Sequence, residues 1–281
     1  MVERRPFLDF LSHAVLILGI VIVVFPVYLT FVASTLTAEE VLDAPMTLIP
    51  GSHLIENYRT VLFQGVGEAA SPVSTMMKNS LIMALGIALG KIAISIISAF
   101  AIVYFKFPLR KTFFWLIFIT LMLPVEVRIL PTYKVVSDLG LLDSYFGLTI
   151  PIIASATATF LFRQFFLTIP DELAEAARID GAGPLRFFWD VVLPLSRTSI
   201  AALFVIQFIY GWNQYLWPLL ITTKESYYTV VMTVSRQANV VDSVPSWNLL
   251  MAMAMLAMLP PVLVVVFMQR QFVRGLVETE K

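Results

Sequence analysis

The chain has no cysteine and only two histidines, His13 and His53, among its 281 residues. The lack of cysteine excludes disulfides, thiolate metal sites and cysteine nucleophiles, and two separated histidines exclude a histidine-rich metal cluster. Charged residues are also scarce, at 14% of the chain, and their formal net charge is zero. A chain without a basic excess offers no electrostatic footprint for nucleic acid, so we expect no nucleic-acid partner.

Apolar residues dominate what is present. Hydrophobic residues make up 59% of the chain, and the mean hydropathy is +0.86. A soluble globular domain is about half apolar and about a quarter charged. The composition therefore predicts an integral membrane protein, surrounded by lipid.

Six segments are long enough to cross a hydrocarbon core as helices, which takes about 20 apolar residues each. The sequence therefore predicts an all-α membrane protein with six transmembrane helices. The third segment is the least regular, because prolines and charges interrupt it. We place the six spans at residues 12–33, 79–105, 112–136, 145–167, 199–221 and 249–268.

The basic residues indicate how these spans are oriented. When Arg163 and Lys134, near the ends of their spans, are counted with the adjoining loops, twelve of the 19 Lys and Arg residues fall on the side that holds both termini and five on the other; Lys91 and Arg128 lie deeper within spans. Cytoplasmic loops carry the excess of positive charge in membrane proteins. Both termini are therefore expected in the cytoplasm.

A charged, helix-forming segment, PDELAEAARIDGAGPLRFFWDVVLP, lies between the fourth and fifth spans at residues 170–194. Pro170 suits a helix start, acidic residues follow where the helix dipole is positive, and Gly181 offers the backbone a sharp stop. Helices that lie on a membrane surface usually carry Lys or Arg with bulky apolar residues. This helix is acidic and Ala-rich, which favours docking into a groove of a partner protein.

The segment also carries a recognisable pattern of residues. Its members are Glu175, Ala176, Ala177, Asp180, Gly181, Leu193 and Pro194. The pattern resembles the EAA signature of ABC-importer permeases. That resemblance implies that the loop 168–198 is cytoplasmic and couples the chain to an ATPase.

Lys91 follows a GxxxG pair, Gly86 and Gly90, which lets another helix approach closely in lipid. It lies about 18 Å from the extracytoplasmic end of its helix, near the bilayer centre. A charge at that depth must face water, a partner charge or the bundle interior. An internal ion pair, a carbonyl contact and direct substrate contact are all open.

The run LPVEVRILPTYK is the other polar feature within the membrane. Its prolines free backbone carbonyls, which is tolerated at membrane depth only beside protein or a water-filled cavity. Arg128 shares its depth with residues 212–214, so these residues could line one cavity; pairing of Glu126 with Arg128, or snorkelling, is the alternative. The candidates for the substrate path are Arg128, Glu126, Trp212, Asn213, Gln214 and Lys91.

Segments along nearly the whole chain extend the resemblance, among them APMTLIPG, ITLMLPVEVRILPT, SATATFLFRQFF and FIYGWNQYLWPLL. They look like the permease subunits of sn-glycerol-3-phosphate ABC importers. The resemblance implies a type I ABC-importer permease fold. It divides the chain into 1–78, with the first span and a periplasmic segment, a five-helix core at 79–270, and a cytoplasmic tail at 271–281.

The resemblance also implies partners and a location. The chain would pair with a related permease subunit in the bacterial inner membrane, above two cytoplasmic ATP-binding subunits and below a periplasmic substrate-binding protein. No GxxxxGK[ST] motif occurs, so ATP and Mg would bind the ATPase and this chain would hold no cofactor or metal. Gln214 stands where many relatives have an acidic residue. An amide there can donate hydrogen bonds, whereas a carboxylate would repel phosphate.

Other functions are open. Within the ABC importers, the substrate could be another sugar, a polyol or a glycerophosphodiester. An ion-coupled secondary transporter should show inverted repeats with paired broken helices, and only one broken helix is evident. A membrane enzyme would need a nucleophile, base or metal grouping, and the sequence offers none, so we expect a transport subunit.

Overall fold

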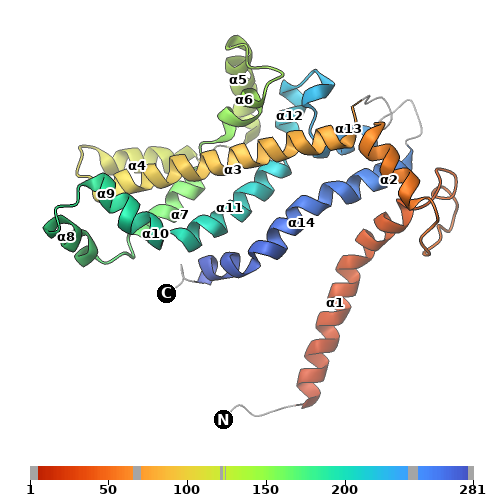
Figure 1. Cartoon of the computed structure of the whole chain (residues 1–281), viewed down its shortest axis with the longest axis horizontal. Helices are drawn as coiled ribbons and strands as arrows, with labels where there is room; N and C mark the ends of the chain where they lie inside the picture. Colours follow the sequence, from red (N-terminus) through yellow and green to blue (C-terminus); the bar gives the residue numbers. More distant parts are fainter. Residues whose placement is uncertain (1–5, 66–70, 121–122, 124, 240–245, 278–281) are drawn as a thin grey trace. The chain divides into compact units, whose positions relative to one another are not determined.

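The computed structural model describes residues 6–65, 71–120, 123, 125–239 and 246–277 (Figure 1). These residues form helices and connecting loops, without a strand, so the predicted all-α class is confirmed. The helices are α1 (Pro6–Ala33), α2 (Leu54–Phe63), α3 (Val73–Tyr104), α4 (Arg110–Ile119), α5 (Val125–Asp138), α6 (Tyr145–Thr149), η2 (Ile150–Ile152), α7 (Ala156–Phe166), α8 (Asp171–Ile179), α9 (Pro184–Phe187), η3 (Phe188–Val192, a π-helix), α10 (Leu193–Leu195), α11 (Arg197–Trp212), α12 (Leu216–Ile221), η4 (Glu225–Tyr227), α13 (Val230–Ala238) and α14 (Trp247–Val277).

Three of the described helices are long and apolar enough to cross a membrane, at Phe10–Ala33, Val73–Tyr104 and Trp247–Gln271. Two pairs of shorter helices meet the same criteria together but are bent. Tyr145–Ile152 with Ala156–Phe166 bends by 50°, and Pro184–Leu195 with Arg197–Trp212 bends by 71°. By length and composition the described residues thus offer three spans, or up to five if each bent pair is one span. The predicted count of six is not confirmed.

The third predicted span, 112–136, is not one helix. The helix α4 ends at Ile119, α5 begins at Val125, and their 10 and 14 residues are each too few to cross a bilayer core. Pro124, which lies outside the described residues, precedes α5 in the sequence. Proline has no N–H to donate and disfavours a helical residue before it, which is the physical reason for a break here.

The fourth and fifth predicted spans are interrupted as well. In 145–167, Ser155 starts a new helix, because its side chain accepts a hydrogen bond from the N–H of Ala158. In 199–221, α11 ends at Trp212 and α12 begins at Leu216. Pro218 has no N–H to donate to a carbonyl four residues earlier, which favours a break between α11 and α12.

The chain divides into two compact units, Met1–Ser74 with Thr233–Met258 and Thr75–Met232 with Leu259–Lys281. In the first unit a buried Asn57 joins three segments. Its Nδ2 donates to the backbone oxygens of Ser34 and Leu36, at 3.0 and 2.8 Å, and its Oδ1 accepts from Nδ2 of Asn248 at 3.3 Å. The amide therefore satisfies carbonyls just after the end of α1 that would otherwise be buried without a donor.

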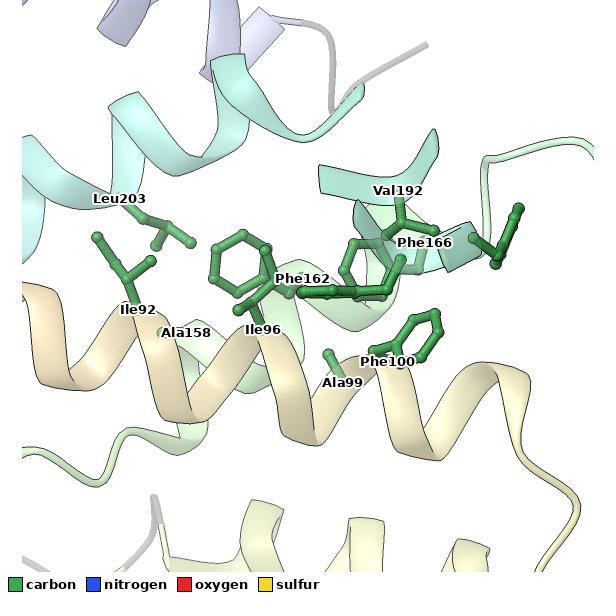
Figure 2. Packing of buried hydrophobic residues seen from close by; sticks show 11 residues of the cluster. Ile92, Ile96, Ala99, Phe100, Ala158, Phe162, Phe166, Val192 and Leu203 are labelled. Carbon is green, nitrogen blue, oxygen red and sulfur yellow. The ribbon is translucent and has the colours of Figure 1, made fainter. Parts of the chain in front are cut away.

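The core of the second unit lies where α7, α9, η3 and α11 pack on α3 (Figure 2). Aromatic rings from three of these elements contact one another, with ring centroids 4.9 Å apart for Phe100 and Phe188 and 6.1 Å apart for Phe162 and Phe166. The buried members are Ile92, Ile96, Ala99, Phe100, Ala158, Phe162, Phe166, Phe187, Phe188, Val192 and Leu203.

The GxxxG pair of α3 packs as the sequence predicts. A Cβ on Gly86 would lie 2.8 Å from Cγ2 of Thr149, and one on Gly90 would lie 2.6 Å from Cγ2 of Ile153. Real side chains do not approach so closely, so only glycine admits the segment around η2 against α3. This contact brings residues 149–153 beside Lys91.

We expect Gly147→Ala to destabilise the second unit. A Cβ there would overlap the backbone oxygen of Leu141, and the Gly147 oxygen also accepts a 3.1 Å hydrogen bond from Nε1 of Trp217. Backbone cannot move as a side chain can, so a loss of about 1–3 kcal/mol is expected. Thermal unfolding in detergent measures it. The control is Gly19→Ala, where the added Cβ meets nothing within 4 Å; equal unfolding temperatures for the two variants would contradict this account.

Candidate functional site

The predicted docking helix is α8, and its end has a defined geometry. Gly181 has a φ of +75°, in the left-handed region that glycine adopts freely. Its N–H donates to the oxygen of Arg178 at 3.0 Å, and the N–H of Ala182 donates to the oxygen of Ala177 at 2.8 Å. These two bonds form a Schellman motif. The expected helix and its stop at Gly181 are confirmed.

One side of α8 packs on its own chain. Ala174 and Ala177 are half-buried against the aromatic core and line a cavity of about 110 Å³ together with Phe100, Tyr104 and Phe187. The small alanines let the helix lie close to the end of α3. The helix is therefore seated on the core and does not hang free in a loop.

The other side of α8 is exposed. Glu175, Ala176 and Asp180 lie there, and the side chain of Ile179 is 85% exposed. Ile179 is apolar and has no covering residue among those described, which suits contact with a partner. Of the apolar residues Leu173, Ala176, Ala177 and Ile179, only Ala177 lies on the packed side.

The remaining two signature residues lie in α10, just before the chain bends into α11. Leu193 and Pro194 are half-buried in α10, and Leu193 packs against the aromatic core. Next to them Ser196 is fully buried, and its Oγ donates to the oxygen of Val192 at 2.6 Å. Since hydroxyl donation to a carbonyl four residues earlier favours a bent helix, Ser196 stabilises the 71° bend at this point.

A second feature is a cavity of about 140 Å³ within the apolar part of the second unit. It collects three of the candidates for the substrate path from three elements: Lys91 from α3, Arg128 from α5, and Gln214 from the turn after α11. The other lining residues are Ile129, Thr132, Pro151, Ile152, Ala154, Tyr210, Leu216 and Trp217. None of the described lining side chains is acidic.

Lys91 is buried in this cavity wall, with 6% of the residue exposed. Its Nζ lies 3.5 Å from the centroid of the Tyr210 ring, over the ring face. No carboxylate pairs with it in the described part of the chain. An aromatic face attracts a cation through its quadrupole, so the ring supplies the stabilisation that an ion pair would otherwise give.

Gln214 has a fixed amide orientation. Its Nε2 donates to the backbone oxygen of Tyr210 at 3.1 Å, and a carbonyl oxygen can only accept, which identifies the nitrogen. The Oε1 atom therefore accepts hydrogen bonds. Gln214 can thus accept from a hydroxyl of a ligand as well as donate with its second N–H.

Two of the other three candidates lie outside this cavity. Trp212 is buried in the core with its ring stacked on Phe208, at a centroid distance of 6.0 Å. Asn213 is exposed where α11 ends, and neither residue lines the cavity. Glu126 lies in α5, but its side chain is outside the described part of the structure. The Glu126–Arg128 pair stays a prediction.

Sequence reasoning missed part of the cavity wall. Tyr210 and Thr132 were not among the candidates, although Tyr210 lies four residues before Gln214 and Thr132 lies four after Arg128. A spacing of four brings side chains to the same helix face, which was the available signal. Pro151 and Ile152 had no such signal, because only the approach to Gly90 brings them there.

The arrangement can bind an anion. Two cations face one cavity, and like charges repel, so an anion between them is favoured. The described residues contain no group of three His, Asp or Glu side chains that could hold a metal ion. Phosphate monoesters, sulfate monoesters and free carboxylates are the ligand chemistries that fit.

A hydrogen-bonded clamp joins two loops of the second unit, 139–144 and 222–224. Asp143 accepts from the N–H and hydroxyl of Thr223 at 2.6 and 2.7 Å and from the N–H of Lys224 at 2.9 Å. Burial raises the pKa of the Asp143 carboxyl, but these hydrogen bonds and the charge of Lys224 together lower it below its ordinary value. These hydrogen bonds hold the two loops together.

We expect this clamp to give the protein an acid-sensitive element. Because the pKa of Asp143 is lowered in the folded state, its stabilisation is present above the ordinary carboxyl pKa of about 4 and is lost as pH falls through the folded value. Asp143→Asn should lower stability by about 1 kcal/mol at pH 7, and this difference from wild type should disappear below pH 4 as the wild-type carboxyl becomes protonated. Unfolding temperature measured from pH 7 to pH 3 tests this; a difference between wild type and variant that stays constant with pH would contradict it.

Comparison with known proteins adds three findings. Residues 91–278 match the family described as binding-protein-dependent transport system inner membrane component. The sn-glycerol-3-phosphate transport system permease protein UgpE of Brucella melitensis biotype 1 is 60% identical over 282 residues, and that of Escherichia coli O1:K1 / APEC is 59% identical over 281 residues; both alignments cover all of each chain. A chain of a bacterial ABC transporter involved in the import of the acidic polysaccharide alginate has the same fold, with a TM-score of 0.81 at 22% identity, covering 97% of this chain and 99% of that one.

Proposed function

The chain belongs to the binding-protein-dependent transport system inner membrane component family, and we propose that it is the permease subunit through which an ATP-driven importer moves sn-glycerol-3-phosphate across the inner membrane. Its full-length relatives carry that substrate in their names. The chain is a transport subunit and not an enzyme.

One observation in this chain supports an anionic substrate. Lys91 and Arg128 line a single cavity whose described lining residues include no acid. The phosphate of a phosphate ester would accept charge-assisted hydrogen bonds from both. Gln214 would accept from a hydroxyl of the glycerol part. A neutral sugar or polyol would leave two cations without a counter-charge, which disfavours it.

Membership of this family implies three kinds of partner: a second permease, an ATPase and a binding protein. We infer a heterodimer with a related permease, two ATP-binding subunits below and a periplasmic binding protein above. ATP and Mg would bind the ATPases and not this chain. Loaded binding protein would dock on the extracytoplasmic loops, ATP would close the ATPase dimer, and α8 would carry that motion to the helices around the cavity.

Uptake by the complete complex in proteoliposomes tests the function. Labelled sn-glycerol-3-phosphate should accumulate only with ATP and the binding protein. Excess unlabelled sn-glycerol-3-phosphate, glycerophosphodiester, glycerol, maltose and inorganic phosphate should be added separately as competitors. The assignment would be overturned if labelled sn-glycerol-3-phosphate did not accumulate, or if excess glycerol or maltose suppressed its accumulation and excess unlabelled sn-glycerol-3-phosphate did not.

A topology experiment tests the proposed orientation. Tags at both termini should be cytoplasmic, and reporters after Ser52 or Ser243 should be extracytoplasmic; Ser243 lies outside the described residues. Because Asp143 and Thr223 are hydrogen-bonded, reporters beside them should report the same side. Termini on opposite sides would mean an odd number of spans.

A further inference from the structure

We propose that Tyr210 is a positioning residue of the substrate cavity: its ring holds the Lys91 ammonium at the cavity wall when no anion is present and yields it to the substrate phosphate. The proposal rests on the proposed function, because it assigns Lys91 to the bound phosphate. It concerns how an unpaired cation is kept available within the membrane.

The contact itself carries the first step. The Lys91 Nζ is 3.5 Å from the ring centroid, and only 6% of the residue is exposed. A buried ammonium without stabilisation would turn toward water or lose its proton. The attraction of a ring face for a cation grows as the cation is desolvated, and Lys91 is almost fully buried.

The second step is why a ring is suited to this task. A carboxylate next to Lys91 would neutralise it and compete permanently with an anionic substrate. A ring carries no net charge, and its attraction for a cation is weaker than that of a phosphate, which forms charge-assisted hydrogen bonds. The ammonium can therefore be exchanged between the two, and the described cavity wall offers no carboxylate as an alternative.

The third step is that Tyr210 is held in register with Lys91. The next residue, Gly211, packs directly on α3, since a Cβ there would lie 3.0 Å from Cα of Ala84. The Tyr210 backbone oxygen also accepts from Gln214 at 3.1 Å, just past the end of α11. These contacts fix the end of α11 against α3, so the position of the ring depends on both helices.

The test uses the complete complex in proteoliposomes, with saturating loaded binding protein and labelled sn-glycerol-3-phosphate. We expect Tyr210→Leu to lower the maximal uptake rate about tenfold, and Tyr210→Phe, which keeps the ring, to remain within about threefold of wild type. In a Lys91→Met background, Tyr210→Leu should cause no further loss. The matched control is Ile206→Ala, an exposed position one turn earlier on α11.

The outcomes distinguish the role of Lys91 in substrate binding from the role of Tyr210 in positioning Lys91. If Lys91→Met leaves uptake unchanged, the cavity is not the substrate site and the proposed role of Lys91 fails first. If Lys91→Met lowers uptake but Tyr210→Leu does not, or lowers it by the same factor in both backgrounds, the positioning role alone is overturned. Equal loss in Tyr210→Phe and Tyr210→Leu would assign the effect to the hydroxyl and also overturn it. Should Tyr210→Leu fail to assemble, Tyr210→Met replaces it with the same expectations.

Discussion

Gly181→Asp is expected to abolish ATP-driven uptake while the protein still inserts into the membrane. A Cβ at Gly181 would meet nothing within 4 Å of this chain, so the new side chain does not disturb the packing of α8. It would instead project from the surface that we assign to the ATPase. Placing a non-glycine residue at a φ of +75° costs about 1–2 kcal/mol, which is too little to unfold the unit. Uptake, ATPase co-purification and membrane content measure the three effects.

Two further variants distinguish an effect on the docked surface from an effect of backbone strain at a positive φ. Gly181→Asn adds a side chain but tolerates the left-handed conformation better than Asp, so it should also block uptake if the docked surface is the cause. Gly140→Asp is the matched control, because Gly140 has a φ of +66° and equally open surroundings but lies in a loop that we expect on the opposite side of the membrane from α8. It should retain the ATPase. Normal uptake by inserted Gly181→Asp protein would remove α8 from the coupling mechanism.

Charge reversal at Glu175 tests the same surface without backbone strain. Glu175 is exposed on α8 and makes no ion pair with the described residues of its own chain. Glu175→Lys should therefore leave the fold intact and weaken the ATPase complex through contacts outside this chain.

Arg128→Gln is expected to lower sn-glycerol-3-phosphate uptake by about ten- to a hundredfold while complex assembly and basal ATPase activity survive. Gln keeps a hydrogen-bond donor but removes the charge, and a hydrogen bond to a charged group contributes about 1.5–3 kcal/mol. The control is Lys134→Gln on the same helix. Lys134 lies 3.0 Å from Asp138 in an ion pair whose Lys side chain is 76% exposed, so its loss should change little.

The alternative for Arg128 is a structural pair with Glu126. Removing the arginine would then leave a buried acid, and a stability loss of about 3–5 kcal/mol would dominate over any effect on substrate. The double variant Arg128→Gln with Glu126→Gln distinguishes the two. Recovery of both assembly and uptake would exclude phosphate binding; recovery of assembly alone would support it.

Local chemistry made α8 predictable. Pro170, two acidic residues and Gly181 specify a short helix without help from the rest of the chain, and the structure has it at Asp171–Ile179. The face that packs was harder to predict. In an Ala-rich helix several stripes are apolar, and only the position of Phe100 and Phe187 selects Ala174 and Ala177 over Ala176.

Breaks within apolar segments were the weak point of the sequence analysis. Hydropathy measures whether a segment suits lipid and not whether its backbone is continuous, so 199–221 reads as one span although α11 ends at Trp212. The sequence analysis predicted that Arg128 and Gln214 could line one cavity, because they lie at the same depth in the membrane. It did not predict that Lys91 lines the same cavity. The contact of Lys91 with Tyr210 was not predicted either, because it depends on how α3 and α11 are rotated toward each other.

The bend at Ser196 would change the direction of a movement that passes from Pro184–Leu195 to Arg197–Trp212. A displacement of the Pro184–Leu195 arm, which carries α9, becomes a swing of the Arg197–Trp212 arm across it, since the two arms meet at 71°. A rigid crank moves most at its far end, and Tyr210 and Gln214 lie at that end. A small shift delivered to α9 would therefore reach the contact of Gly211 with α3, next to the cavity wall that Lys91 and Tyr210 line.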